Sequence, residues 1–243
     1  MKFILSPSKL QHSHAHLPPT TNIAQQLAPS LNLFGILQQM SEQEIASIMM
    51  IKGKLLDETV KLYQQFSANN SMIRAIDCYR GAVFQQLQLK QYSSSQRAYM
   101  NQHLRILSAM YGVLQPDSTI WPYRLDLTMK PTGISLVEYW QQRVAKQFAS
   151  EEVLVNLASE EFSPLLEPLI DRVIHIHFQE RQKDGQLKTV STYAKQARGR
   201  MVHQCIRREV KEPTELKREE IYGYLFDATM STDHHYYFIK EKT

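Results

Sequence analysis

The spacing of apolar residues along this chain predicts strands and helices in alternation. A continuous apolar run over residues 153–157 is typical of a parallel strand that is covered on both faces. Residues 104–110 fit either a helix or a buried strand, and we favour a strand because a turn follows at Tyr111-Gly112. Short β-type runs or period-two alternation predict the other strands, at residues 2–5, 122–127, 173–178, 187–191, 220–227 and 236–240.

Helical periodicity accounts for most of the remaining chain. It predicts helices over residues 22–37, 41–51, 55–66, 81–89, 94–103, 136–148 and 192–210. A further helix, interrupted by Pro164 and Pro168, follows residue 159. Strands and helices alternate in the middle of the chain, and residues 183–186 make a hairpin turn near its end. We therefore predict an α/β fold, a mixed β-sheet surrounded by helices, in one domain over residues 1–243.

Two consecutive helices have the outline of a helix-hairpin-helix element, over about residues 41–66. Ser41 and Glu44 have the spacing of a capping box at the start of the first helix. Lys52-Gly53-Lys54 separates the two helices, and the backbone N–H groups of such a turn can grip a DNA phosphate without reading bases. Only one glycine is present where the usual pattern has two, so an ordinary helical hairpin is the alternative.

The helix predicted at residues 192–210 carries cations beside its apolar face. At about 100° per residue, one face of this helix is formed by Ala194, Ala197, Met201 and Cys205. Arg198 falls within this face and Lys195 lies at its border, whereas Arg200, Arg207 and Lys211 point to another side. A buried guanidinium needs a carboxylate partner or an anion-filled cleft. Glu160 or Glu161 could supply the carboxylate, and the sequence leaves both interpretations open.

Composition excludes several classes of protein. Hydrophobic residues make up 43% of 243 residues, yet no stretch approaches the roughly 20 apolar residues of a membrane helix. The first residues lack the pattern of a signal peptide. Cys78 and Cys205 lie far apart in contexts that indicate burial, which fits a reducing compartment. We therefore expect a cytoplasmic protein that does not associate with membranes.

Positive charge is concentrated in one part of the chain. Residues 181–218 contain eleven Lys or Arg residues and four Asp or Glu residues, a net charge of +7, whereas the whole chain carries +4. The rest of the chain therefore carries −3. Basic residues gathered in one segment are typical of a protein with an acidic partner, most often nucleic acid. A solvated basic helix without a partner is the alternative.

Motifs of the common cofactor and metal enzymes do not occur. The sequence has no G-x-G-x-x-G or P-loop pattern, no H-E-x-x-H, no C-x-x-C pair and no G-x-S-x-G. We expect no cofactor and no metal. His12, His14 and His16 alternate beside Pro18-Pro19, which favours a polar loop over a metal site. His175 and His177 alternate within a predicted strand, and we interpret them as exposed strand residues.

Several residues that can bind phosphate or a base fall at the ends of predicted elements. Glycine follows a cation or a phenol at Arg80-Gly81, Tyr111-Gly112 and Arg198-Gly199, and glycine permits close approach of the backbone to a ligand. Tyr123-Arg124 could stack a base. Asn156 and Ser159 follow the most hydrophobic strand, at the edge of the sheet where α/β proteins gather ligand sites.

Five stretches together resemble the YaaA peroxide-stress family. They are residues 5–9 (LSPSK), 103–114 (HLRILSAMYGVL), 122–125 (PYRL), 155–161 (VNLASEE) and 193–199 (YAKQARG). The resemblance implies a single-domain α/β fold with a positively charged cleft and a helix-hairpin-helix element. It also implies a cytoplasmic bacterial protein that binds DNA and limits damage from free iron during peroxide stress.

The chain departs from the family pattern at two places. Lys9 is followed by Leu10-Gln11-His12 where the family usually has Thr-Leu-Asp. Arg80-Gly81-Ala82 stands where the family often has Lys-Gly-Asp, so the cation is kept and the carboxylate is not. A role that depends on that carboxylate is therefore not expected in this chain.

Two functions are carried forward. The first is a monomeric DNA-binding stress protein whose cleft holds backbone phosphates largely independently of sequence. The alternative is an enzyme that acts on a nucleotide or nucleobase in the same cleft, with Lys195 or a carboxylate near Ser159 in an acid–base or nucleophilic role. No catalytic residue is assigned. The candidate phosphate-binding residues are Lys9, Lys52, Lys54, Arg80, Arg105, Tyr123, Arg124, Asn156, Ser159, Lys195, Arg198 and Arg200.

Overall fold

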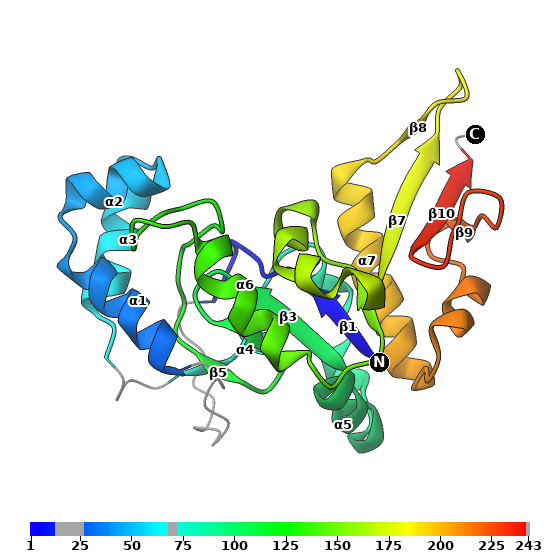
Figure 1. Cartoon of the computed structure of the whole chain (residues 1–243), viewed down its shortest axis with the longest axis horizontal. Coiled ribbons are helices and arrows are strands. Elements are labelled where there is room, and N and C mark those ends of the chain that lie inside the picture. The colour runs from blue at the N-terminus through cyan, green and yellow to red at the C-terminus, as the bar shows by residue number, and fades with distance from the viewer. Residues whose placement is uncertain (13–26, 68–71, 242–243) are drawn as a thin grey trace.

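The centre of the protein is a β-sheet with parallel strands in its middle (Figure 1). The structure, a computed structural model, describes residues 1–12, 27–67 and 72–241. Within these residues, eight strands form the main sheet. Its parallel strands lie in the order β3 (Leu104–Ser108), β1 (Lys2–Leu5), β6 (Leu154–Asn156), β7 (Val173–Arg181) and β10 (His235–Glu241). The predicted mixed α/β sheet is therefore confirmed.

Antiparallel strands complete the sheet. β4 (Gly112–Leu114) pairs with β3, and β9 (Leu225–Phe226) pairs with β10. β8 (Leu187–Lys188) pairs with β7 as the predicted hairpin. A separate two-stranded ladder joins β2 (Ile73–Arg74) to β5 (Thr119–Ile120). The central strands are covered on both faces, since Phe3, Ile4 and Leu5 are all buried. This explains why the apolar runs in the sequence are continuous.

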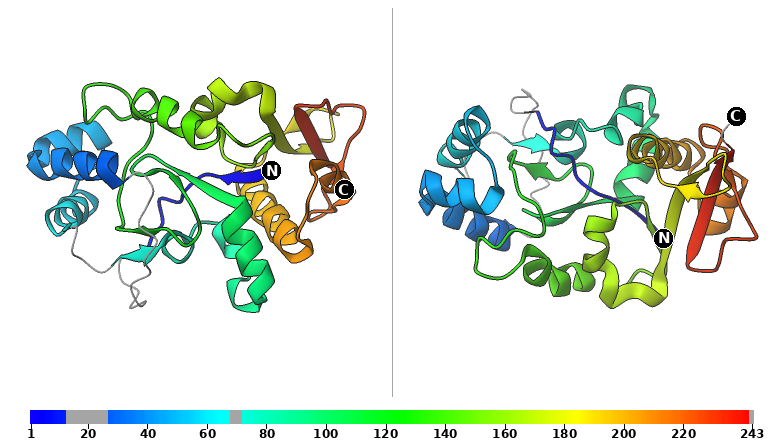
Figure 2. Two further views of the ribbon diagram at one scale, coloured as in Figure 1. Left: turned by 60° about the horizontal axis from the view of Figure 1, so that its bottom comes forward. Right: turned by 90° about the horizontal axis from the view of Figure 1, so that it is seen from above.

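Helices cover both faces of the sheet, and a further group of helices lies beyond one end of it (Figure 2). α6 (Leu136–Gln147) packs against β4 and against the long 3₁₀ segment Glu160–Arg172. α5 (Ser94–His103) packs against β1 and β3, and α7 (Ser191–Arg208) packs against β7. The helices α1 (Leu27–Gln39), α2 (Glu42–Met49) and α3 (Lys54–Gln64) lie together at the opposite end from β10, and the short α4 (Ala75–Cys78) follows β2.

The predicted helical hairpin is present as α2 and α3. Its capping box forms, because Ser41 Oγ accepts the backbone N–H of Glu44 at 3.3 Å and Glu44 accepts the backbone N–H of Ser41 at 2.8 Å. Gly53 has a φ of 58°, which favours glycine, and it begins α3. Lys52 and Lys54 are exposed at the turn. A DNA-binding role of this hairpin stays a prediction.

Two predicted elements are wrong. Residues 81–89 form no α-helix: they contain the short 3₁₀ helix Phe84–Gln86, and a second one, Leu89–Gln91, begins at their end. Residues 122–127 are mostly buried but join no strand, because their backbone donors go to side chains: Tyr123 N–H to Gln11 Oε1 at 2.9 Å and Arg124 N–H to Tyr63 Oη at 3.1 Å. Alternating burial therefore arose here without a β-ladder.

Other boundaries shift for local reasons. The segment with Pro164 and Pro168 is 3₁₀ rather than α-helical, since proline cannot donate the backbone hydrogen bonds of a longer helix. α3 ends at Gln64, and Phe66 beyond it stacks on Phe34 with ring centroids 3.7 Å apart. Of residues 220–227, only Leu225–Phe226 is a strand. Two further predictions, for His14 with His16 and for residues 22–26 of the first helix, lie outside the described residues.

No helix of the described part of the chain is long and apolar enough to cross a membrane.

Candidate functional site

Two serines at the carboxyl ends of neighbouring parallel strands form the base of a cavity. Ser6 follows β1 directly, and Ser159 lies three residues beyond the end of β6. Ser6 Oγ accepts the backbone N–H of Ser159 at 2.8 Å and donates to Ser159 Oγ at 3.2 Å. Parallel α/β sheets gather ligand sites at this edge, so the predicted location of the site agrees with the cavity that the structure contains.

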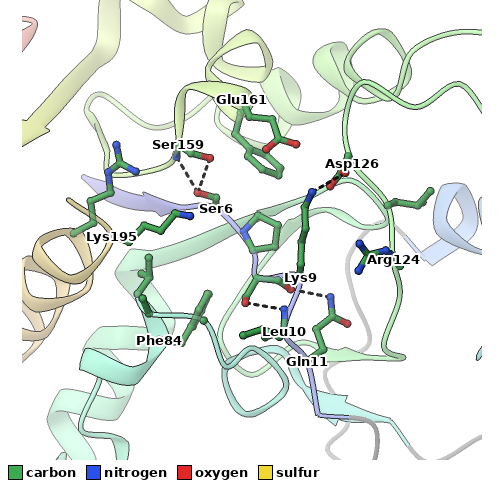
Figure 3. Close-up of a pocket in the computed structure, with 18 of the residues that line it drawn as sticks. Ser6, Lys9, Leu10, Gln11, Phe84, Arg124, Asp126, Ser159, Glu161 and Lys195 are labelled. Carbon is green, nitrogen blue, oxygen red and sulfur yellow. Dashed lines mark hydrogen bonds and ion pairs between the residues drawn. The ribbon is translucent and has the colours of Figure 1, made fainter. Parts of the chain in front are cut away.

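The cavity has a volume of about 420 Å³ (Figure 3). Its wall comes from five separate segments of the chain: residues 6–11, residues 81–84, residues 123–126, residue 159 with residues 161–162, and the first half of α7. Apolar side chains such as Leu10 and Phe84 lie on one side, and Glu161 lies on the opposite side. The cavity therefore combines polar groups with an apolar surface, as small-molecule sites commonly do.

Positive charge exceeds negative charge in the wall. Of the described residues, Lys9, Arg124, Lys195 and Arg198 contribute cations, and Asp126 and Glu161 contribute carboxylates. Lys9 Nζ lies 2.8 Å from Asp126 Oδ2, so these two charges offset each other. The other cations form no ion pair within the described part of the chain. The cavity is therefore suited to an anionic group.

Arg198 is the most constrained of these cations. Its Nε is buried and has no hydrogen-bond partner among the described residues. Burial lowers the pKa of its guanidinium, and the charge of Glu160 acts in the opposite direction. Neither Glu160 nor Glu161 forms an ion pair with Arg198 in the described chain. The structure therefore does not contain the salt bridge that was one of the two interpretations of Arg198. Because Arg198 lines the cavity, the structure favours the other interpretation, a cleft that holds an anion.

Glu161 is the carboxylate near Ser159 for which the sequence left open a structural role, as partner of Arg198, and a role in acid–base chemistry. Burial raises the pKa of this carboxyl, and the negative charge of Asp126 adds to the effect. The positive charges of Lys9 and Lys195 and a hydrogen bond with the backbone of Leu127 act in the opposite direction. Glu161 is thus held close to two cations without forming an ion pair with either in the described chain.

Glycines beside the cations have a different role from the one expected. A Cβ at Gly199 would lie 2.1 Å from the carbonyl oxygen of Val83, and one at Gly81 would lie 2.5 Å from Ser8 Oγ. At Gly112 it would lie 2.7 Å from the ring of Trp140. These glycines permit close approach to other parts of the protein rather than to a ligand. Gly199 in this way lets α7 contact the segment that carries Val83, which brings Lys195 and Arg198 to the cavity.

Six of the predicted site residues line the cavity: Lys9, Tyr123, Arg124, Ser159, Lys195 and Arg198. Tyr123 does so with a ring that is only 4% exposed, and its hydroxyl lies 3.0 Å from that of Tyr79 and 2.7 Å from Ser108 Oγ. Stacking of a base on this ring was therefore a wrong expectation, because the ring is packed in the core.

The remaining predicted site residues lie elsewhere. Asn156 is the last residue of β6 and is buried. Its Oδ1 accepts the backbone N–H of Ala158, which fixes the turn after the strand. Arg80 lies next to the wall and contacts His12 Nδ1 at 3.3 Å. Arg105 donates to the carbonyls of Asn101 and Leu104 in a separate shallow depression. Arg200 lies over the ring of Tyr222, and Lys52 and Lys54 lie at the α2–α3 turn.

The histidines of β7 are not exposed strand residues as expected. His175 and His177 are half-buried, and both rings stack on His235 of β10, with centroids 5.1 and 5.2 Å apart. The parallel register places His235 beside His175, and Tyr237 beside His177. Because β10 begins about sixty residues after β7, alternation within β7 could not reveal this stack.

Ser6 and Asp126 were missed as site residues. The sequence marks Ser6 only as the residue before Pro7, where the first strand ends, and strand ends of this kind are the signal that could have identified it. Asp126 lay in a segment interpreted as a strand, so its position beside Lys9, 117 residues away, had no local signal.

Comparison with known proteins places the chain in one group. Residues 1–230 match the family model described as "Peroxide stress protein YaaA". A UPF0246 protein of Fusobacterium nucleatum subsp. nucleatum is 32% identical, and the match covers 100% of both chains. UPF0246 proteins of Rickettsia felis and Acaryochloris marina are 34% and 31% identical, with matches that cover 91% and 99% of this chain and 92% and 100% of theirs.

Proposed function

This chain belongs to the peroxide stress protein YaaA family, and from that premise we propose that it acts in peroxide stress by binding DNA phosphates in its electropositive cavity. Binding of this kind would shield DNA from iron-dependent oxidative damage. The protein acts as a monomer in the cytoplasm, a location that its two free thiols support.

The observation that carries the proposal is the state of Arg198. A buried guanidinium N–H without a partner, such as Nε of Arg198, costs stability unless a ligand supplies the missing hydrogen bond. Phosphate oxygens match the planar fork of Arg in a bidentate geometry. Lys195 lies one helical turn before Arg198 and lines the same cavity, so two cations of α7 can bind one anionic group.

The α2–α3 hairpin adds a second contact with the DNA backbone. Lys52 and Lys54 are exposed beside Gly53, and the first backbone N–H groups of a helix favour an anion. Neither lysine lines the cavity. The proposal thus assigns backbone contacts to both sites, and neither contact reads base sequence.

The thiols argue against a direct reaction with peroxide. Burial raises the pKa of Cys78 to about 12 and also raises that of Cys205. Peroxide reacts with thiolates, and these thiols are protonated and buried near pH 7. The proposed role is therefore protection of the target of damage rather than removal of peroxide by a cysteine.

Salt dependence of DNA affinity tests the proposal. Each neutralised phosphate contributes about −0.9 to the slope of log affinity against log salt on duplex DNA. We expect a slope steeper than about −2 in fluorescence anisotropy titrations with a labelled duplex of arbitrary sequence. Lys195→Ala should make this slope shallower by about one. A flat response to salt, or an unchanged slope in Lys195→Ala, would contradict the proposal.

An enzyme that acts on a nucleotide or nucleobase is the second candidate. It is favoured by Glu161, whose raised pKa gives a carboxyl suited to proton transfer beside Lys195. Incubation with damaged DNA and with free nucleotides, followed by mass spectrometry, tests this function. Absence of any product across that panel would exclude it for the compounds tested.

A further inference from the structure

The two carboxylates of the cavity are not explained by phosphate binding. An anion-binding wall gains nothing from Glu161, which would repel a phosphate. Asp126 is engaged by Lys9 at 2.8 Å, whereas Glu161 forms no ion pair with any described residue. A carboxylate without an ion pair, in a cavity whose cations Arg124, Lys195 and Arg198 also lack one within the described chain, suits a ligand that carries both a negative group and N–H donors.

We infer that the cavity holds one nucleotide unit, with its phosphate at Ser159, Lys195 and Arg198 and a guanine base at the carboxylate of Glu161. The inference deepens the proposed function, because it rests on phosphate binding in the same cavity and names the base that enters with it.

The size of the cavity supports a single unit. A volume of about 420 Å³ lies within the range of sites for small ligands. A DNA duplex, whose major groove alone is about 12 Å wide, is far too large to enter and can only lie across the opening. The buried Nε of Arg198 is therefore reached by one phosphate group at a time, from the backbone of a DNA that lies across the opening or from a free nucleotide.

The phosphate end has donors that the protein leaves unused. The hydroxyl of Ser6 is already occupied, since it accepts from the backbone of Ser159 and donates to Ser159 Oγ. Ser159 Oγ accepts this bond, so its own proton is available for a ligand. Lys195 and Arg198 of α7 add charged donors to the wall, and Lys195 lies on the same side as Ser159 (Figure 3). Together they match a phosphate rather than a base.

Another part of the wall suits a base. Glu161 lies across from Leu10 and Phe84 in the wall, so a flat ring between them contacts apolar surface and reaches the carboxylate at its edge (Figure 3). Guanine presents N1–H and the 2-amino group side by side, which match the two oxygens of one carboxylate. Adenine and cytosine place a ring acceptor beside their amino group, and thymine has no amino group.

Binding of free nucleotides tests the inference. The probes are dGMP and dIMP, which differ only in the 2-amino group, and deoxyribose 5-phosphate, which has no base. We expect dGMP to bind roughly tenfold more tightly than dIMP in calorimetric titrations at low salt. In Glu161→Gln the two nucleotides should bind equally, because the amide offers one acceptor instead of two. Glu160→Gln is the matched control, since Glu160 is exposed and does not line the cavity.

The outcomes separate this inference from the proposed function. Equal binding of dGMP and dIMP to the unchanged protein, or discrimination that survives Glu161→Gln, would overturn the assignment of guanine to Glu161. DNA binding with a steep salt slope but no nucleotide binding would overturn the inference and leave the proposed function standing. Discrimination of dGMP from dIMP without any DNA binding would support the inference and overturn the proposed function. Lys195→Ala should weaken the binding of dGMP, dIMP and deoxyribose 5-phosphate by the same factor.

Discussion

Arg198 lies on α7 among Ala194, Ala197 and Met201, all of which are buried. Arg198 itself is half-buried, and its buried, unpaired Nε lowers stability because water no longer solvates that N–H. The protein retains the charge at a position where the helix would otherwise be apolar. Sites at which a local rule of folding is broken are commonly sites of function.

Replacement of this residue should separate stability from binding. Arg198→Met keeps most of the apolar side chain and removes the buried charge, so stability should stay unchanged or rise by up to about 2 kcal/mol. DNA affinity at low salt should fall roughly tenfold, since a charged bidentate contact is lost. Chemical denaturation and anisotropy measure the two effects. Arg207→Met, at an exposed position of the same helix, is the control: it should change stability and DNA affinity less than Arg198→Met does. A large loss of stability with normal binding would contradict the interpretation.

At the scale of elements, the position of α7 decides whether the cavity forms. α7 reaches the segment of Val83 through Gly199, and this contact leaves no space for a methyl group. A second helical glycine, Gly35 of α1, has nothing within 4 Å of an added Cβ and has no positive φ. The two positions therefore offer the same substitution in opposite environments.

Alanine at these two glycines should have effects of opposite sign. Gly199→Ala places a Cβ 2.1 Å from a carbonyl oxygen, so we expect a loss of about 1–3 kcal/mol and weaker DNA binding as α7 is displaced. Gly35→Ala should stabilise the protein by up to about 1 kcal/mol, because alanine is the better helix former. Thermal unfolding of both variants measures this. Equal melting temperatures would show that α7 tolerates the displacement.

At the scale of the whole molecule, the charges of the basic segment are dispersed. Residues 181–218 carry a net charge of +7 in the sequence, and several of these cations have local partners. Arg181 pairs with Glu241, Arg208 pairs with Glu219, and Lys217 lies over the rings of Phe226 and Tyr236. Of this segment, Lys195 and Arg198 line the cavity within the described chain. The electropositive site combines them with Lys9 and Arg124 from other segments.

Global stability should depend on pH through the histidine stack of β7 and β10. The ring of His177 contacts those of His175, His235 and Tyr237. Burial is the main cause that lowers the pKa of His177 from 6.5 to about 4, and the charges of His235, His175 and Arg198 lower it further. The unfolded chain therefore binds a proton at His177 before the folded protein does. The free energy of unfolding should decrease as the pH falls from about 6.5 towards 4.

Urea unfolding between pH 7 and pH 4 measures this dependence. In His177→Gln the decrease should be smaller, since the ring that resists protonation is absent. Carboxylates with lowered pKa values, such as Asp227, add to the decrease in both proteins, so the difference between them isolates the histidine. An identical pH dependence of the two proteins would exclude a contribution from His177.

Elements with strong local signals were predicted correctly. The helix predicted at residues 136–148 is Leu136–Gln147, and the helix at 192–210 is Ser191–Arg208. The capping box of Ser41 and the apolar strand of β6 also formed as expected. These features arise from hydrogen bonds and side-chain spacing within a few residues, so a local pattern contains the information needed. Residues 122–127 failed because their alternating burial came from side-chain contacts with distant residues, Gln11 and Tyr63.

Local pattern alone thus established the α/β class, most helices and strands, and the presence of a cation within the apolar face of α7. Folding of the chain determined which charges share a cavity, because Lys9 meets Asp126 across 117 residues and Ser6 meets Ser159 across 153. It also determined that Arg105 and Arg200 lie outside that cavity. Electrostatic interactions depend on distance in space, and the separation of residues along the chain does not specify that distance.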